Sequence, residues 1–194
     1  TFISRKRKKA KHERRMVVEQ NISIEVIHGH EVNEKQIEVA YEFYQNTFDR
    51  KSGIPTLNAN FFKEICHTMG EQVVFMFALL NNDYIACAIS LKGSNALYGR
   101  FWGCKQEFHS LHFETCLYQG IDYCIKNNLQ TFEPGAQGEH KITRGFLPTK
   151  TWSAHWIKES QFQEAIYNFC QREQTAMHEQ CEELLSLSPY RIEE

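Results

Sequence analysis

Polar side chains of the kinds that carry out group transfer gather in two stretches of the sequence. One stretch follows a predicted strand at residues 96–102, and the other follows a short predicted strand at residues 130–133. If these strands are parallel neighbours, both stretches emerge at the carboxyl end of the sheet, which is where open α/β sheets bind ligands. The residues that would converge there are His112, Glu114, Glu133, Gln137, His140, Lys141 and Arg144.

These side chains offer a general base, a hydrogen-bond clamp and cations for an anionic group. Glu133 ends a strand beside Pro134, and it is either a general base or an acid held by structural hydrogen bonds. Lys141 and Arg144 follow His140 closely. The three predict a phosphate- or carboxylate-binding cluster, with a solvated charge cluster as the alternative.

The loop at residues 135–138 adds a second kind of binding element. Gly135 and Gly138 flank Gln137, and glycines let backbone N–H groups approach a phosphate. The run matches neither G-x-x-x-x-G-K-[ST] nor G-x-G-x-x-G, so the alternative is a loop that needs glycine only for its positive φ. The histidines of the region lack the spacing of a zinc site, and we predict no metal.

The elements that would position these residues follow from the hydrophobic pattern, because apolar runs predict strands and apolar residues at helical spacing predict helices. Helices are predicted at residues 4–19, 33–48, 58–69, 111–127 and 161–187, strands at 22–26, 73–80, 84–91, 96–102, 130–133 and 151–157, and a loop at 134–150. This order predicts an α/β fold in which one mixed, twisted sheet is flanked by helices.

The chain has 194 residues and a formal net charge of -2, which suits one compact domain with a real core. No apolar run approaches the roughly 18–20 residues of a membrane helix, so no membrane span is predicted. The seven cysteines include no C-x-x-C pair and indicate a reducing, cytoplasmic setting. The first residue is Thr1 rather than Met, from which we expect a piece of a longer protein.

Basic residues crowd the start of the chain. Residues 5–15 contain eight Lys and Arg side chains and a single acid, Glu13. Such a run would bind RNA or an anionic membrane surface, and the alternative is a solvated first helix. The predicted domains are a basic N-terminal helix at residues 1–20 and a single domain at residues 21–194.

Six runs of the sequence carry a family likeness: residues 97–103, 111–114, 118–121, 133–141, 144–148 and 153–156. Together they resemble the bacterial FemAB-like family, described as peptidoglycan biosynthesis or recognition proteins of the GNAT acyltransferase superfamily. The resemblance covers almost the whole chain. It implies a GNAT-like fold and acyl transfer to an amine, with acyl-CoA or aminoacyl-tRNA as the donor. It also implies that the chain is the carboxyl-terminal half of a longer, two-domain protein.

One departure from related acetyltransferases bears on the donor. Many acetyltransferases carry R/Q-x-x-G-x-G/A between the fourth strand and the following helix, where it binds the pyrophosphate of CoA. Residues 102–110 occupy that junction here and lack the motif. CoA binding of the usual kind is therefore not expected from this segment.

The resemblance and the clustered residues lead to one hypothesis and two alternatives. An N-acyltransferase or aminoacyltransferase domain would use Glu133 or Glu114, with His112, to accept the proton of the attacking amine, and backbone N–H groups near Gly103 to hold the oxyanion. The first alternative is a non-catalytic domain that recognises a peptidoglycan precursor or RNA, and the second is a fold kept as a structural or dimerisation module. The predicted binding residues are Arg100, Trp102, Gly135, Gln137, Gly138, His140, Lys141 and Arg144.

Overall fold

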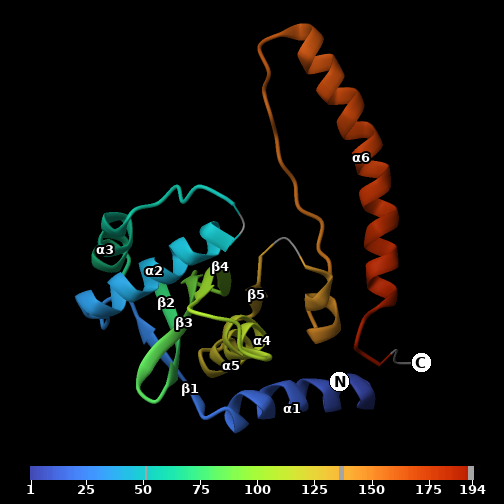
Figure 1. Ribbon diagram of the computed structural model, residues 1–194. Helices are drawn as coiled ribbons and strands as arrows, with labels where there is room; N and C mark the ends of the chain where they lie inside the picture. Colours follow the sequence, from blue (N-terminus) through green and yellow to red (C-terminus); the bar gives the residue numbers. More distant parts are fainter. Residues whose placement is uncertain (51, 136–137, 192–194) are drawn as a thin grey trace. The chain divides into compact units, whose positions relative to one another are not determined.

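The computed structural model describes residues 1–50, 52–135 and 138–191 (Figure 1). The chain forms two compact units. The larger unit comprises residues 8–137, and the smaller comprises residues 1–7 together with 138–194. The predicted division into a helix at residues 1–20 and one domain at residues 21–194 stays a prediction.

A five-stranded sheet forms the centre of the larger unit. Its strands lie in the order β1-β2-β3-β4-β5 and are antiparallel except for β4 and β5, which are parallel. Asn81 and Asn82 both adopt positive φ between β2 and β3, as the two-residue hairpin turn requires. The strands are β1 (Ile22–His28), β2 (Val73–Leu80), β3 (Asp83–Lys92), β4 (Ala96–Cys104) and β5 (Thr131–Glu133). The predicted mixed sheet and its parallel pair are confirmed.

Alternate residues of the continuous apolar strand β2 cover opposite faces of the sheet. Phe75 and Phe77 point into a core built with α2 (Glu34–Arg50) and α3 (Ala59–Thr68). Met76 and Ala78 point to the other face, where α1 (Ser4–Glu19) and the segment that follows β4 pack. Helices therefore flank the sheet on both faces (Figure 1).

The start of α2 is held as the sequence predicts. The side-chain oxygen of Asn33 accepts from the backbone N–H of Gln36, and the Gln36 side chain accepts from the backbone N–H of Asn33, each at 2.9 Å. This reciprocal capping box satisfies two backbone donors that the first turn of a helix leaves without intrahelical partners.

The helix after β4 differs from the single helix predicted at residues 111–127. It begins as α4 (Leu111–Phe113), widens into the π-helical turn η1 (Glu114–Tyr118) and continues as α5 (Gln119–Lys126). A π turn contains one more residue than an α turn, and such turns are often found at functional sites. Hydrophobic periodicity does not reveal the extra residue, because the apolar stripe continues through it.

The smaller unit departs further from the prediction. Residues 139–144, expected to be loop, form the 3-10 helix η2 (Glu139–Arg144), and α6 (Ser160–Ser186) is the predicted long helix. The strand predicted at residues 151–157 is wrong, since this segment forms no ladder with any described strand. Its two tryptophans, Trp152 and Trp156, are more than 80% exposed. Alternation alone does not make a strand without a neighbour to bond to.

The ends of the smaller unit are joined by backbone bonds. Ile3 donates to the carbonyl of Pro189 at 2.8 Å, and Arg191 donates to that of Thr1 at 3.1 Å.

Within the described part of the chain, no helix combines the length and the apolar character needed to cross a bilayer.

We predict that Gly103→Ala destabilises the larger unit by about 1–3 kcal/mol. A Cβ at Gly103 would overlap the backbone carbonyl of Phe43 in α2, and backbone cannot move aside as a flexible side chain does. Urea denaturation of the purified variant measures the loss.

Gly99→Ala is the matched control, since it lies in the same strand. A Cβ there would first meet Pro134 at an ordinary contact distance of 3.4 Å, so the change should be below about 1 kcal/mol. Equal stability losses in the two variants would contradict the packing argument.

Candidate active site

The parallel pairing of β4 with β5 is short. It joins Ala96–Tyr98 to Thr131–Glu133, after which β4 continues to Cys104 without β5. A β-bulge follows directly, because Ile89 pairs with Phe101 and Ser90 pairs with Gly99, which leaves Arg100 as the extra residue. The two strands therefore part at the carboxyl end of β5. This is the sheet end at which the sequence placed the site.

A pocket of about 400 Å³ lies at the junction of β4 and α4. It contains two of the predicted residues, Trp102 and His112, whose rings meet edge to face with centroids 5.3 Å apart. Both side chains are half-buried. The pocket is lined by Arg50, Trp102, Cys104, Gln106, Glu107, Phe108, Ser110, Leu111, His112 and Phe113.

One face of α2 fastens the end of β4 beside this pocket. Thr47 donates its hydroxyl to the Trp102 carbonyl at 2.5 Å. One turn later, Arg50 donates to the carbonyls of Cys104 at 3.1 Å and Lys105 at 2.8 Å, and to the Cys104 sulfur at 3.1 Å. The guanidinium thus satisfies two backbone acceptors and places a positive charge in the pocket wall.

The loop between β4 and α4 closes the other side of the pocket. Ser110 takes the left-handed conformation, with φ of 63°, just before α4 begins. Its hydroxyl lies 2.9 Å from Nδ1 of His109, and Gln20 donates to the His109 carbonyl at 3.1 Å. The loop is therefore tied to the end of α1.

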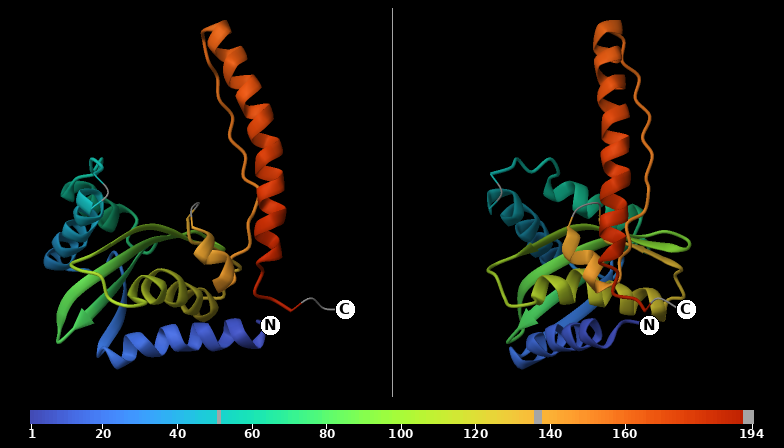
Figure 2. Two further views of the ribbon diagram at one scale, coloured as in Figure 1. Left: turned by 45° about the vertical axis from the view of Figure 1, so that its right-hand side comes forward. Right: turned by 90° about the vertical axis from the view of Figure 1, so that its right-hand side faces the viewer.

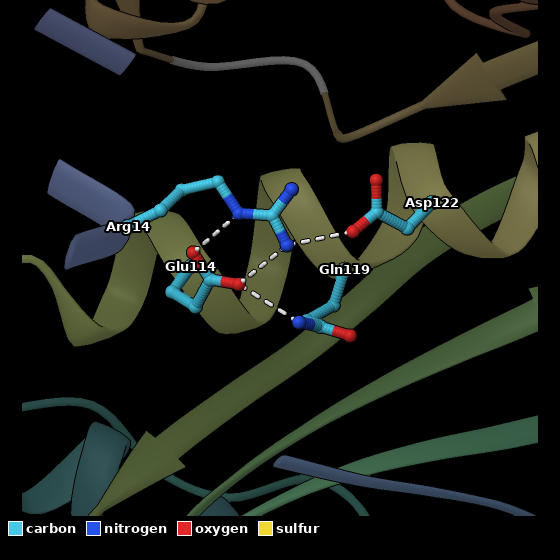
Figure 3. Close-up of polar contacts among 4 residues, drawn as sticks. All are labelled: Arg14, Glu114, Gln119 and Asp122. Atoms are coloured by element: carbon cyan, nitrogen blue, oxygen red, sulfur yellow. Dashed lines mark hydrogen bonds and ion pairs between the residues drawn. The ribbon is translucent and has the colours of Figure 1, made fainter. Parts of the chain in front are cut away.

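Glu114 lies just beyond the pocket and takes part in a charged cluster with α1 (Figure 3). Arg14 donates to both of its carboxylate oxygens, at 3.2 and 3.0 Å, and to Asp122 at 2.6 Å. Gln119 adds a bond of 2.8 Å to Glu114. Burial acts to lower the pKa of Arg14, but Asp122 and Glu114 outweigh it and raise this pKa above its ordinary value.

A second buried acid, Glu13 of α1, contacts the same π-helical turn. The hydroxyl of Tyr118 donates to Glu13 at 2.6 Å, and Lys9 lies 3.9 Å from the same carboxylate. Arg14 and Glu13 thus face the protein, whereas Lys8, Lys11 and Arg15 are exposed. The basic run is neither wholly solvated nor wholly available to a partner.

The three predicted bases therefore have different surroundings. His112 is half-buried in the pocket wall, and Glu133 is exposed at the end of β5. Glu114 is buried, and its carboxylate already accepts from Arg14 and Gln119. Of the three, Glu114 is the least accessible to a substrate, because it is buried and both of its carboxylate oxygens already accept hydrogen bonds.

The predicted binding residues divide between the two units. In the larger unit Arg100 is exposed on the bulge of β4, and Gly135 has positive φ of 95°. In the smaller unit Gly138 has positive φ of 110°, Lys141 is half-buried and Arg144 is buried. Gln137 lies outside the described residues. The glycines of this loop thus do adopt the conformation that favours glycine.

His140 and Arg144 form a local cluster in η2. Arg144 donates to the His140 carbonyl at 2.7 Å, and the imidazole packs so closely on Gly138 that a Cβ there would overlap it. Burial lowers the pKa of His140, and the nearby charges of Arg144 and Lys141 lower it further. Both effects favour the neutral imidazole, so the positive charge of the cluster comes mainly from Arg144 and Lys141.

Sequence reasoning missed Arg50, Thr47 and Arg14 as parts of this region. Arg50 and Thr47 fall on the polar-looking end of a helix and touch residues more than fifty positions away. Arg14 is one of eight cations in residues 5–15, and nothing in the sequence distinguishes it from the others. Only Gln36 and Asn33, which are close in sequence, left a signal of their contact. Among the described residues, no three His, Cys, Asp or Glu side chains come together as a metal site.

We predict that Arg14→Met costs about 1–3 kcal/mol of stability. The variant leaves the Glu114 carboxylate buried without its cation. Because Arg14 is partly exposed, the loss of stability should be smaller than for a fully buried ion pair. Arg15→Met is the control, because the contacts of Arg15 with Glu19 and with the His12 ring lie on the exposed surface of the same helix, and the change should cost at most about 0.5 kcal/mol. Thermal and urea unfolding compare the two, and equal losses would refute a structural role for Arg14.

His140 should titrate below its ordinary pKa of 6.5. The unfolded chain, in which His140 keeps its ordinary pKa, then binds the proton more readily than the folded chain. The free energy of unfolding therefore decreases as the pH falls from 6.5 toward the lower pKa of the folded state. NMR titration of the imidazole C–H signal measures the midpoint. Lys141→Met removes one of the charges and should move this midpoint upward; an unchanged or lower midpoint would show that Lys141 does not act on the ring.

Comparison with solved structures identifies the fold. An aminoglycoside acetyltransferase from an uncultured soil metagenomic sample, in complex with sisomicin, is 8% identical with a TM-score of 0.55, covering 74% of this chain and 99% of that one. A protein of Clostridium acetobutylicum, described as a predicted acetyltransferase with acetyl-CoA, is 14% identical with a TM-score of 0.51, covering 69% and 95%. The chain therefore has the GNAT acetyltransferase fold that the sequence predicted.

No curated protein matches the sequence significantly. The family model for FemAB-like peptidoglycan biosynthesis/recognition proteins matches residues 1–192, nearly the whole length. The resemblance read from the motifs is thereby confirmed, and the chain belongs to the FemAB-like family.

Proposed function

We propose that this chain is an N-acyltransferase domain that transfers an acyl group to an amine, with the acyl group bound where β4 parts from β5. The observation that carries the proposal is this parting at Tyr98 and Glu133, followed by the bulge at Arg100 and the pocket at Trp102. Membership of the FemAB-like family and the GNAT acetyltransferase fold support it. The family description supports a peptidoglycan precursor as the acceptor.

The pocket at the β4–α4 junction would hold an anionic part of the donor. Arg50 supplies a fixed cation in its wall, and Ser110 supplies a hydroxyl. This is a different solution from a glycine-rich loop that binds a pyrophosphate through backbone N–H groups. The donor would be either an acyl-CoA or an aminoacyl-tRNA. A cytoplasmic setting and an upstream half of the protein stay predictions.

In the proposed reaction the amine nitrogen attacks the acyl carbonyl carbon. A C–N bond forms, the C–S or C–O bond to the donor breaks, and the leaving group takes up a proton. Glu133 would accept the proton that the amine loses, because it is exposed at the end of β5, next to the parting strands. His112 would contact the donor, since it lines the pocket. Glu114 would have a positioning role, because its bond to Arg14 joins α1 to the π-helical turn.

A second candidate is recognition of RNA or a peptidoglycan precursor without catalysis. Lys8, Lys11 and Arg15 are exposed along α1, and the pocket lacks the glycine-rich pyrophosphate motif. Phosphate contacts of this kind weaken steeply with salt. Salt-dependent RNA binding that is lost when the three cations become Gln, without any acyl transfer, would favour this candidate.

The proposed activity predicts separate effects for the base and the pocket. With acetyl-CoA or an aminoacyl-tRNA as donor and a UDP-linked muropeptide as acceptor, Glu133→Gln should lower turnover about 10²–10⁴-fold and leave donor binding unchanged. Glu139→Gln, an exposed acid of η2, is its control. Amide formation detected by mass spectrometry measures transfer, and full activity of Glu133→Gln would exclude Glu133 as the base.

Trp102→Leu and His112→Ala should instead reduce the rise in melting temperature that the donor produces, because bound donor stabilises the folded state by mass action. Trp152→Leu, which alters a tryptophan that is 84% exposed, is the matched control. An unchanged thermal shift in both pocket variants would place the donor elsewhere.

A further inference from the structure

In the smaller unit, the long helix α6 carries a largely exposed apolar stripe. No residue of its 27 is buried. At 1.5 Å per residue the helix is about 40 Å long, and Figure 2 shows it as one continuous rod. Phe162, Phe169 and Met177 are 59%, 51% and 51% exposed. Monomeric proteins seldom leave so long an apolar face in water, so a partner for this face is expected.

The positions of the stripe repeat in steps of three and four residues, which keeps them on one side of a helix. They are Phe162, Ile166, Phe169, Glu173, Met177, Gln180, Leu184 and Leu187. From residue 166 onward the stripe positions are nearly symmetric about the point between residues 176 and 177, so the spacing is almost the same in both directions along the helix. A face with that property can pack on a second copy of itself that runs in the opposite direction.

This reversal defines a register. It places Phe169 opposite Leu184 of a second copy, and Ile166 opposite Leu187, so that large apolar side chains meet at both ends of the overlap. The two polar positions of the stripe also meet each other, because Glu173 falls opposite Gln180, whose amide can donate to the carboxylate. Polar groups placed in such an interface cost stability when mismatched and so select one register.

The charges beside the stripe favour the antiparallel direction. At 3.6 residues per turn, Arg172, Glu179 and Glu183 lie along the same flank. The two-fold axis of an antiparallel pair brings this flank of both copies together. In the register above, Arg172 is level with the midpoint between Glu179 and Glu183 of the second copy, so it is offset by about 3 Å along the axis from each of them. In a parallel pair this flank would instead face the uncharged flank that carries Cys170 and Gln174, and the two Glu173 carboxylates of the stripe would meet.

We propose that α6 pairs antiparallel with α6 of a second copy of this chain, making it a two-fold symmetric dimer. The occupant is a second copy because the apolar, polar and charged positions of this face match those of a second, reversed copy, as an isologous interface requires. The proposal goes beyond the proposed acyl transfer and does not depend on it.

The mass of the whole chain in solution, measured by sedimentation equilibrium, tests the pairing. The wild-type chain should be a dimer at micromolar concentration, and Phe169→Glu should raise the dissociation constant at least tenfold. Gln171→Glu adds the same charge on the opposite face of α6 and should leave the dimer intact. A monomeric wild type, or equal effects of the two variants, would overturn the proposal.

A crosslink between two native cysteines tests the register and the direction. Cys170 and Cys181 lie on the flank away from Arg172 and face each other across the antiparallel pair. Within one helix they are about 16 Å apart, too far for a short bismaleimide. Mass spectrometry should find Cys170 joined to Cys181 between two chains, and Cys170→Ser should abolish the product. Links of Cys170 to Cys170 alone would mean a parallel pair and refute the register.

Discussion

The fastening of α2 onto the end of β4 is the constraint on which the candidate site depends. Three residues of one helix face, spaced four and three apart, carry it. The backbone of Phe43 fills the space beside Gly103, Thr47 holds the carbonyl of Trp102, and Arg50 holds two further carbonyls. The hydrogen bonds of Thr47 and Arg50 reach backbone carbonyls and so do not depend on the side chain of Trp102, whereas the Phe43 contact requires glycine at position 103. Trp102 and Cys104 are thereby presented to the pocket from a strand end that cannot shift freely.

A second fastening acts from the opposite face of the sheet. Arg14 joins Glu114, the first residue of the π-helical turn, to Asp122 of α5. Bidentate guanidinium–carboxylate bonding has a defined geometry, so it orients the widened turn as well as neutralising a buried charge. The basic helix α1 is thus part of the framework of the site. The exposed cations of α1, Lys8, Lys11 and Arg15, take no part in this contact.

Local patterns in the sequence were sufficient for most of the fold. The alternation in β1, the apolar runs of β2 and β3 and the capping box of Asn33 and Gln36 each depend on neighbours in the chain, and each is confirmed. The parallel pair of β4 and β5 followed from the helix between them. The strand expected at residues 151–157 failed because a strand needs a bonding partner, which alternation does not specify. Arg50 and Arg14 escaped notice because their partners are distant in sequence.

The shortness of β5 has a consequence for motion. Strands β1 to β4 are joined by long antiparallel ladders, whereas β5 is held by three residue pairs at the margin of the sheet. Segments with few ladder bonds open at a lower free energy than the whole domain unfolds, and amide hydrogens report such openings by exchanging early. Detachment of β5 would carry Glu133 away from β4 and leave the rest of the sheet intact. The edge that bears the candidate base is thus the part of the sheet that fluctuates most easily.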